Sequence, residues 1–385
     1  MFFIGFEIGG FQLVLRSVSS QFSMAATGSG LLVAAQNIGV VMMPLLFGSL
    51  SDRIGKRRVL LIFAALFLAG CAAAALAGSA PAFVMGVFLI GAGYSVCECT
   101  ASAALSDAYP EKSAQYINLS QCMFSLGAVA SPILIRYGMS GFAWSWRSVF
   151  VICAGAYVLL MFPLLRVRFN APPVGVPPVG APSAWVEPKA RVSLFVFFKN
   201  DIFLLLFLNI LLYIGLESGV GYFTETLFTL KLGQEALGAY AISAFWAMTA
   251  LSRLVFGLMR LSPKRALLVS FGASAALIVL LAVLRLPLLS LVVCGLIGFV
   301  FGPVWPLLID LAAKQFPHNS GGAIGLMSAG CGLGGIAFPA VMGFLADHTD
   351  LRLSFLLLSL TALAAGSLCL MMTIREKRRQ ASENG

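Results

Sequence analysis

The sequence predicts an all-α integral membrane protein with twelve transmembrane helices in two pseudo-symmetric six-helix halves. Of its 385 residues, 60% are hydrophobic and only 10% are charged, which is far from the composition of soluble domains. Apolar stretches also repeatedly approach the roughly 20 residues that a helix needs to cross a bilayer. In addition, the two halves of the chain resemble each other at a fixed offset. Together these observations exclude a water-soluble enzyme.

The apolar stretches form two groups of six. They lie at about 2–18, 28–50, 59–78, 82–106, 114–137 and 148–165, and then at about 202–226, 236–259, 265–284, 288–312, 321–345 and 353–374. The predicted domains are an N-terminal six-helix bundle at 1–166, a cytoplasmic Pro/Gly-rich linker at 167–200, a C-terminal six-helix bundle at 201–374 and a basic cytoplasmic tail at 375–385.

The linker is predicted from its prolines, which are too frequent for a helix. A proline-rich ligand for a recognition domain is the less favoured interpretation of this segment.

The two halves align at an offset of 207 residues. The matched pairs include Gly91 with Gly298, Pro110 with Pro317, Ser113 with Ser320 and Pro132 with Pro339. Six crossings return the chain to the same side of the membrane, so the halves are predicted to be parallel repeats. Internal repeats of this kind are typical of transporter folds.

Charge placement predicts the topology and explains the net charge of +10. If both termini lie inside, most of the 25 basic residues, Arg253 among them, face the cytoplasm. This arrangement agrees with the rule that short cytoplasmic loops are enriched in Lys and Arg. We therefore expect a multi-pass protein of the bacterial cytoplasmic membrane with cytoplasmic termini and no nucleic-acid partner. The eight cysteines all lie in apolar stretches, where packing is favoured over disulfides or metal binding.

The loop between the second and third apolar stretches carries a recognisable motif. Residues 48–59 read GSLSDRIGKRRV. This loop resembles the signature loop of the major facilitator superfamily, which implies that it is a conformational latch. The residues that carry the resemblance, and the expected gating role, are Gly48, Asp52, Arg53, Gly55, Arg57 and Arg58. The alternative is a solvated loop whose basic residues only set topology.

A narrower resemblance covers nearly the whole chain. Residues 91–101 (GAGYSVCECTA), residues 118–127 (NLSQCMFSLG), residues 213–222 and the Trp305-Pro306 pair are similar to the fucose-galactose-hexose symporter branch. The resemblance implies that Glu98 is the proton site. Two departures, Gln12 where the branch often has an acid and Phe124 where it has an asparagine, imply a substrate that differs from fucose.

Glu98 also stands out on physical grounds. It lies about eight residues, or roughly 12 Å, from the predicted cytoplasmic end of its helix. An ionised carboxylate at that depth is costly, so Glu98 should face a cavity or be protonated. The alternative is a permanently neutral structural glutamate. Glu7, near the start of the first helix, is expected to lie in the headgroup region instead.

Sugar recognition requires amides and carboxylates for hydroxyl groups and an aromatic face for the ring. The candidates are Gln12, Gln36, Asn37, Asn118, Gln121, Tyr213, Glu217, Tyr222, Trp246 and Trp305. Gln121 and Trp305 are favoured because they match binding positions of the branch. Interhelical packing is as plausible for Gln36, Asn37, Tyr213, Tyr222 and Trp246. For Glu217, sugar binding and a role at the interface between the halves are equally favoured.

The resulting functional prediction is a secondary active transporter that takes up a hexose-like sugar with protons by alternating access. The alternative is a proton-coupled exporter of drugs or small metabolites. An enzyme is not indicated, because His318 and His348 lie in loops and no nucleophile–base motif or nucleotide-binding loop accompanies them. We expect no cofactor or metal, a monomer, and only substrate, protons and membrane lipids as partners.

Overall fold

A computed structural model describes residues 1–47, 54–109, 113–166, 197–258, 262–316 and 320–383. Within these ranges the chain forms thirteen α-helices joined by short connections. They provide twelve segments that are long and apolar enough to cross a membrane. The predicted fold class, an all-α protein with twelve transmembrane segments, is therefore confirmed.

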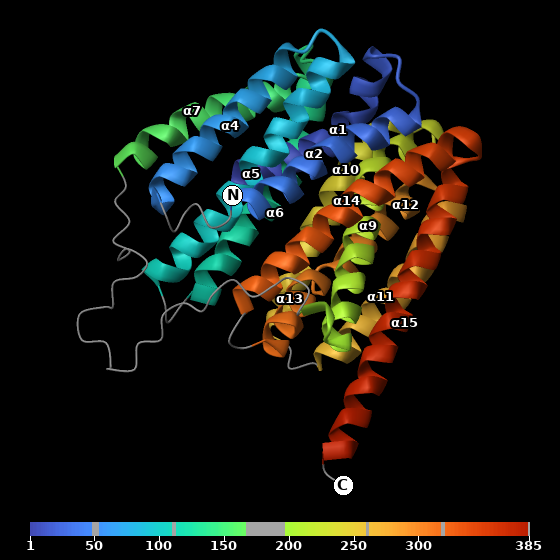
Figure 1. Ribbon diagram of the computed structural model, residues 1–385. Coiled ribbons are helices and arrows are strands. Elements are labelled where there is room, and N and C mark those ends of the chain that lie inside the picture. Colours follow the sequence, from blue (N-terminus) through green and yellow to red (C-terminus); the bar gives the residue numbers. More distant parts are fainter. Residues whose placement is uncertain (48–53, 110–112, 167–196, 259–261, 317–319, 384–385) are drawn as a thin grey trace.

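The helices fall into two groups along the sequence (Figure 1). The first group comprises α1 (Phe2–Gln21), α2 (Ala26–Phe47), α4 (Lys56–Leu76), α5 (Ala80–Ala108), α6 (Ser113–Gly141) and α7 (Ser148–Arg166). The second group comprises α9 (Asp201–Leu230), α10 (Glu235–Leu258), α11 (Pro263–Val283), α12 (Pro287–Phe301), α13 (Val304–Gln315), α14 (Ser320–His348) and α15 (Leu351–Glu383). In Figure 1, α4 and α7 lie at the left edge and α11 and α15 at the right.

Two helix boundaries differ from the prediction. The single helix expected at 288–312 is two helices, α12 and α13, that meet at Gly302 and Pro303. Proline has no backbone N–H and clashes with the preceding turn, so Pro303 and Pro306 together prevent a continuous helix. At the C-terminus, α15 continues to Glu383, through most of the segment expected as a basic tail.

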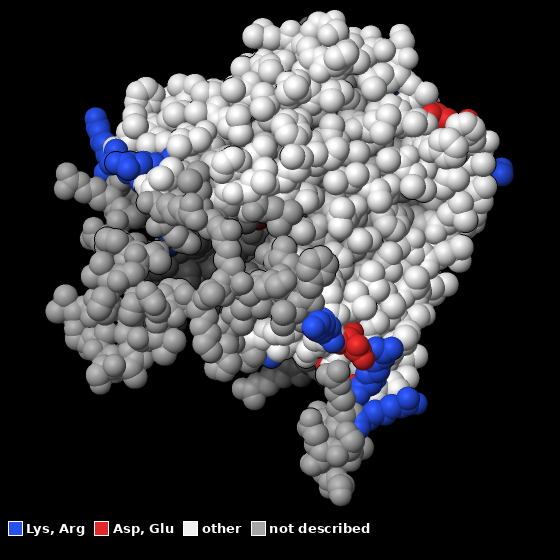
Figure 2. All heavy atoms as spheres, viewed as in Figure 1, with Lys and Arg blue, Asp and Glu red and all other residues white. Residues whose placement is uncertain are grey.

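Six short connections lie at one end of the helices. They are residues 22–25, 77–79, 142–147, 231–234, 284–286 and 349–350, and this end is called the short-turn face below. Figure 2 shows most of the visible Lys, Arg, Asp and Glu toward the edges of the molecule, with a broad uncharged surface between them. This distribution is typical of a protein whose middle is surrounded by lipid.

The two halves meet mainly where α2 packs against α14 and α6 packs against α10. The α2–α14 contact depends on glycine, because a Cβ atom at Gly30 would lie 2.1 Å from the carbonyl oxygen of Pro339. Small residues allow such close backbone approach between membrane helices. A Cβ atom at Gly343 would likewise clash with the carbonyl oxygen of Ala26, the first residue of α2, so the halves also approach closely beside the short-turn face.

Candidate functional site

The break between α12 and α13 leaves backbone carbonyl groups without helical partners. Pro306 cannot donate to the carbonyl of Gly302, which instead accepts a hydrogen bond from Nε of Arg253 at 3.4 Å. The carbonyl of Phe301 accepts one from the hydroxyl of Tyr213 at 3.2 Å. Broken helices within a membrane persist only where side chains or water satisfy such groups. Discontinuous helices of this kind also mark transporter binding sites.

Arg253 connects this break to the first half. Its guanidinium group donates to the hydroxyl of Ser125 on α6 at 3.4 Å. It also interacts electrostatically with the carboxyl groups of Glu98 and Glu217. The expectation that Arg253 belongs only to the basic cytoplasmic residues is therefore too simple. The signal for a central role was available, since Arg253 lies inside the apolar run at 236–259.

Glu98 and Gln121 form a pair in the first half. Nε2 of Gln121 on α6 donates to Oε1 of Glu98 on α5 at 2.9 Å. Both side chains are half-buried. Ser125 follows Gln121 by one turn of the same helix, so the partner of Arg253 and the partner of Glu98 lie on one face of α6. The structure thus brings Glu98, Gln121 and Arg253 into one region.

Two further predicted residues lie at the second-half side of this region. Glu217 is half-buried and accepts a hydrogen bond from the hydroxyl of Tyr213, one turn earlier on α9, at 3.1 Å. Trp305, in the first turn of α13, is half-buried and interacts with Cys331 of α14. Cys331 also interacts electrostatically with Glu217 and Glu98, so the indole lies in the same region as these carboxyl groups. An aromatic ring and carboxyl groups together offer apolar and polar contacts to a small molecule.

The remaining predicted binding residues are engaged with one another or with the backbone. Gln12 is buried and accepts from Nε1 of Trp246 at 2.9 Å, while Asn37 donates to the carbonyl of Val33 at 2.9 Å. Gln36 and Tyr222 are buried and hydrogen-bonded to each other at 3.2 Å. In this conformation the Gln12–Trp246 and Gln36–Tyr222 bonds join helices of the two halves, whereas the Asn37 bond lies within α2. The side chain of Asn118 lies outside the described residues.

Glu7 is enclosed by protein, so its carboxyl group is not exposed to lipid headgroups in this conformation. Its side chain is completely buried, with 0% of its surface exposed, and both carboxyl oxygens contact Nε2 of Gln36. The position of Glu7 along α1 indicates its depth, whereas the helices packed around α1 determine how much of its side chain is exposed. The only feature of the sequence that pointed to a buried Glu7 was the presence of a carboxyl group within the first apolar stretch.

The short-turn face is closed by two contacts between the halves. Asp347 of α14 accepts hydrogen bonds from the backbone N–H groups of Ala26 and Thr27 at the start of α2. Arg136 of α6 forms an ion pair with Glu235 of α10. These contacts hold both halves together at this end of the molecule.

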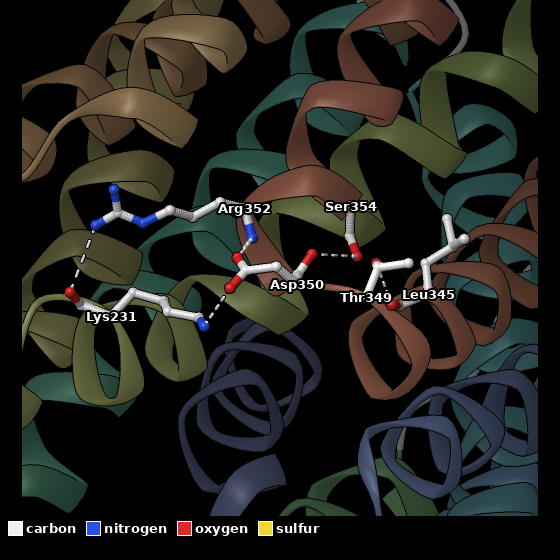
Figure 3. A network of polar contacts seen from close by, with 6 residues as sticks. All are labelled: Lys231, Leu345, Thr349, Asp350, Arg352 and Ser354. Atoms are coloured by element: carbon white, nitrogen blue, oxygen red, sulfur yellow. Dashed lines mark hydrogen bonds and ion pairs between the residues drawn. The ribbon is translucent and has the colours of Figure 1, made fainter.

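A third network on the short-turn face lies within the second half (Figure 3). Asp350 accepts from Nζ of Lys231 at 2.5 Å and from the backbone N–H of Arg352 at 2.7 Å. The guanidinium group of Arg352 in turn donates to the carbonyl of Lys231 at 3.5 Å. Asp350 therefore caps α15 and ties it to the end of α9.

The signature loop is described only in part. Gly48, Asp52 and Arg53 lie outside the described residues. Gly55 has a φ angle of 89°, a conformation that glycine adopts without a steric penalty, and it precedes α4 directly. Arg57 donates to the carbonyl of Leu165 at the end of α7, and Arg58 is exposed.

Curated proteins similar to the chain include several transporters. A putative niacin/nicotinamide transporter NiaP of Bacillus subtilis is 24% identical over 160 residues, 41% of this chain and 40% of that protein. A multidrug resistance protein Stp of Mycobacterium tuberculosis is 28% identical over 39% of this chain and 28% of its own length. A galactose-proton symporter of Escherichia coli is 25% identical over 40% of this chain and 34% of its length. The chain thus spans at most 40% of these relatives.

Solved structures share the fold over nearly the whole chain. A variant of the nucleoside transporter NupG has a TM-score of 0.73 at 16% identity, covering 96% of this chain and 98% of its own. A variant of the E. coli fucose:proton symporter FucP has a TM-score of 0.64 at 17% identity, covering 96% and 97%. The sequence model of the Major Facilitator Superfamily matches residues 1–321 and again 232–385. The chain therefore belongs to the Major Facilitator Superfamily, and it is a multi-pass membrane protein.

Proposed function

We propose that this transporter takes up a hexose-like sugar together with protons, with Glu98 as the proton-coupling residue. The observation that carries this proposal is the half-buried Glu98–Gln121 pair, which lies near Arg253 at the break between α12 and α13. A carboxyl group held by an amide in a partly accessible region combines a proton carrier with a hydrogen-bonding group for a hydroxyl.

The substrate would bind between the halves. Gln121 from α6 supplies an amide, and Trp305 from α13 supplies an aromatic face for the C–H side of a sugar ring. Glu217 supplies a second carboxyl group from α9. The names of two similar proteins, a galactose-proton symporter and a fucose:proton symporter, support this substrate class. The buried candidates Gln12, Gln36, Tyr213, Tyr222 and Trp246 would take part only after the halves rearrange.

Proton binding would be tied to substrate binding through the Gln121 amide. Because that amide contacts Glu98 directly, a sugar hydroxyl that competes for Gln121 changes the hydrogen bonding of the carboxyl group. Arg253 stabilises the ionised form electrostatically. Proton release from Glu98 is thereby favoured when Arg253 is free of other anionic partners.

The closed short-turn face indicates the direction of access. We propose that this face is extracellular, that both termini are cytoplasmic and that the protein lies in the bacterial cytoplasmic membrane, because the basic residues concentrate at the opposite end. The structure then represents the state closed to the outside. Rocking of the two six-helix bundles, at 1–166 and 201–374, about the interface would expose the site to each side in turn.

Uptake by proteoliposomes tests this proposal. The purified protein is reconstituted, a pH gradient or a sodium gradient is imposed, and accumulation of labelled monosaccharides is measured. We expect accumulation of at least one hexose under the pH gradient alone. Accumulation under the sodium gradient alone would reject proton coupling. Expulsion of a cationic dye without sugar accumulation would reject symport in favour of an exporter, an activity that the name of the Stp relative supports.

A further inference from the structure

Glu7 is a fully buried carboxyl group that the proposed transport cycle does not use. It lies on α1, and its side chain has no solvent-exposed surface. Nε2 of Gln36 on α2 contacts Oε1 of Glu7 at 3.1 Å and Oε2 at 3.0 Å. Two acid oxygens therefore share one neutral amide donor.

This contact continues into the second half of the protein. Because Nε2 of Gln36 faces Glu7, its Oε1 is the acceptor on the other side, and the hydroxyl of Tyr222 donates to it at 3.2 Å. Gln36 and Tyr222 are 1% and 5% exposed, so water does not compete for this contact. Glu7, Gln36 and Tyr222 thus form a buried chain from α1 through α2 to α9, across the interface between the halves.

Among the described residues, the titratable groups that interact electrostatically with Glu7 carry no positive charge. They are Tyr222 on α9, Tyr94 on α5 and Cys71 on α4, all neutral at neutral pH. Gln36, its hydrogen-bond partner, is neutral as well. A buried carboxylate without a charged partner is costly, and taking up a proton removes that cost.

We propose that Glu7 is a second proton-binding site and that Gln36 and Tyr222 couple its protonation to the interface between the halves. Protonated Glu7 fits the conformation in which the short-turn face is closed and the Tyr222 hydroxyl is hydrogen-bonded to Gln36. Separation of the halves removes Tyr222, admits water and favours release of the proton. The inference rests on the proposed function only in assuming that a proton gradient drives the cycle.

The first test counts titrating carboxyl groups without any sugar. Infrared difference spectra between low and high pH are recorded for the purified protein in lipid nanodiscs, using the band of protonated carboxylic acids. Glu7→Gln should remove one component of this band, and Glu98→Gln should remove a different one. A Glu7→Gln spectrum identical to that of the unmodified protein would overturn the proposal.

The second test measures the coupling. Spin labels at Gly78 and Leu286, in two different connections of the short-turn face, report the separation of the halves in a cysteine-free background. Raising the pH should populate longer distances in the parent protein. Tyr222→Phe should lose at least most of this pH response while keeping the Glu7 infrared component. Tyr94→Phe is the matched control, because Tyr94 also faces Glu7 but belongs to the same half, and its response should be unchanged.

Two results would overturn the coupling: a distance distribution of the parent protein that does not depend on pH, or an equal response in Tyr222→Phe and the parent. If Glu7→Gln does not fold, Gln36→Met replaces it, since methionine has a similar volume without hydrogen-bonding groups. Gln36→Met should also abolish the pH response, and an unchanged response would count against the proposal. Both readouts need no substrate, so a failure of sugar uptake is distinguishable from a failure of this inference.

Discussion

Asp347 and Thr27 are 320 residues apart in the sequence and join the two halves of the protein. The Asp347 carboxylate accepts from the backbone N–H of Thr27 at 2.7 Å and from its hydroxyl at 2.6 Å. It also accepts from the backbone N–H of Ala26 at 2.8 Å. An acid from α14 thus caps the N-terminus of α2, where free N–H groups and the helix dipole favour negative charge.

Removing this cap should open the short-turn face. Asp347→Ala loses an N-terminal cap worth about 1 kcal/mol, which corresponds to about a fivefold shift toward the open state. Distances between spin labels at Gly78 and Leu286 measure the shift. Asp310→Ala is the control, because Asp310 pairs with Lys314 within α13. Equal distance distributions in the two variants would show that Asp347 does not hold the face closed.

Arg136 and Glu235 make the second contact across this face. Reversing either charge alone, by Arg136→Glu or Glu235→Arg, should place like charges together and favour the open state. The double reversal should restore the closed state, because the pair is reconstituted with exchanged signs. The expected coupling is about 0.2–1 kcal/mol, since both side chains are partly exposed. Additive effects in this double-mutant cycle would mean that the ion pair contributes nothing.

Glu98→Gln should abolish sugar accumulation driven by a pH gradient while preserving exchange of internal for external sugar. Glutamine keeps the hydrogen bond to Gln121 but cannot carry a proton. Active uptake and counterflow in proteoliposomes separate the two activities. Cys99→Ser, at the adjacent exposed position of α5, is the control and should accumulate sugar normally. Undiminished accumulation in Glu98→Gln would remove this residue from the coupling mechanism.

The hydrogen bond from Arg253 to the Gly302 carbonyl predicts that a second substitution at the helix break can restore stability lost with Arg253. Arg253→Met should destabilise the protein by about 1–3 kcal/mol, because the Gly302 carbonyl loses its donor. Pro306→Ala supplies a backbone N–H four residues after Gly302, so it should recover part of that stability. Transport should stay impaired, since Arg253 also faces Glu98. Thermal unfolding of the single and double variants measures the recovery of stability. An equal loss of stability in Arg253→Met with and without Pro306→Ala would contradict the prediction.

Asp350 predicts a pH dependence at the short-turn face. The hydrogen bond from Lys231, together with that from the Arg352 N–H, lowers the pKa of the Asp350 carboxyl below its usual range. A depressed pKa gives stabilisation that is complete above the unfolded-state value, about 3.9, and is lost as the pH falls through the folded-state value. Because the pair is exposed, the effect should stay below about 1 kcal/mol.

Thermal unfolding between pH 7 and pH 3 measures this contribution. Asp350→Asn should lower stability at pH 7 and leave a smaller difference from the parent at pH 3. A constant difference across the range would show that the carboxylate charge does not matter.

The fold class followed from the sequence because membrane insertion imposes a local rule. Each crossing must be apolar over its own length, and each backbone group must be satisfied within its own helix. The twelve segments could therefore be recognised one at a time. The pairing of Glu98 with Gln121 could also have been predicted from the sequence, since both residues lie in segments that resemble the same symporter branch.

The break between α12 and α13 could not be predicted from hydrophobicity, because the apolar run continues through Pro303. The prolines were visible, but their consequence depends on whether another helix can satisfy the freed carbonyls. Arg253 and Tyr213 do so from α10 and α9.

The sequence by itself determined which segments cross the membrane and which few acids lie within them. Only the tertiary structure decided their surroundings, because burial and pairing in a helical bundle depend on neighbours that are distant in sequence. Glu7 shows this most directly: its place near the start of α1 suggested a headgroup position, while packing against other helices and the contact with Gln36 of α2 leave its side chain with no exposed surface. Asp347, which is exposed and near the end of its helix, is likewise significant only because α2 begins beside it.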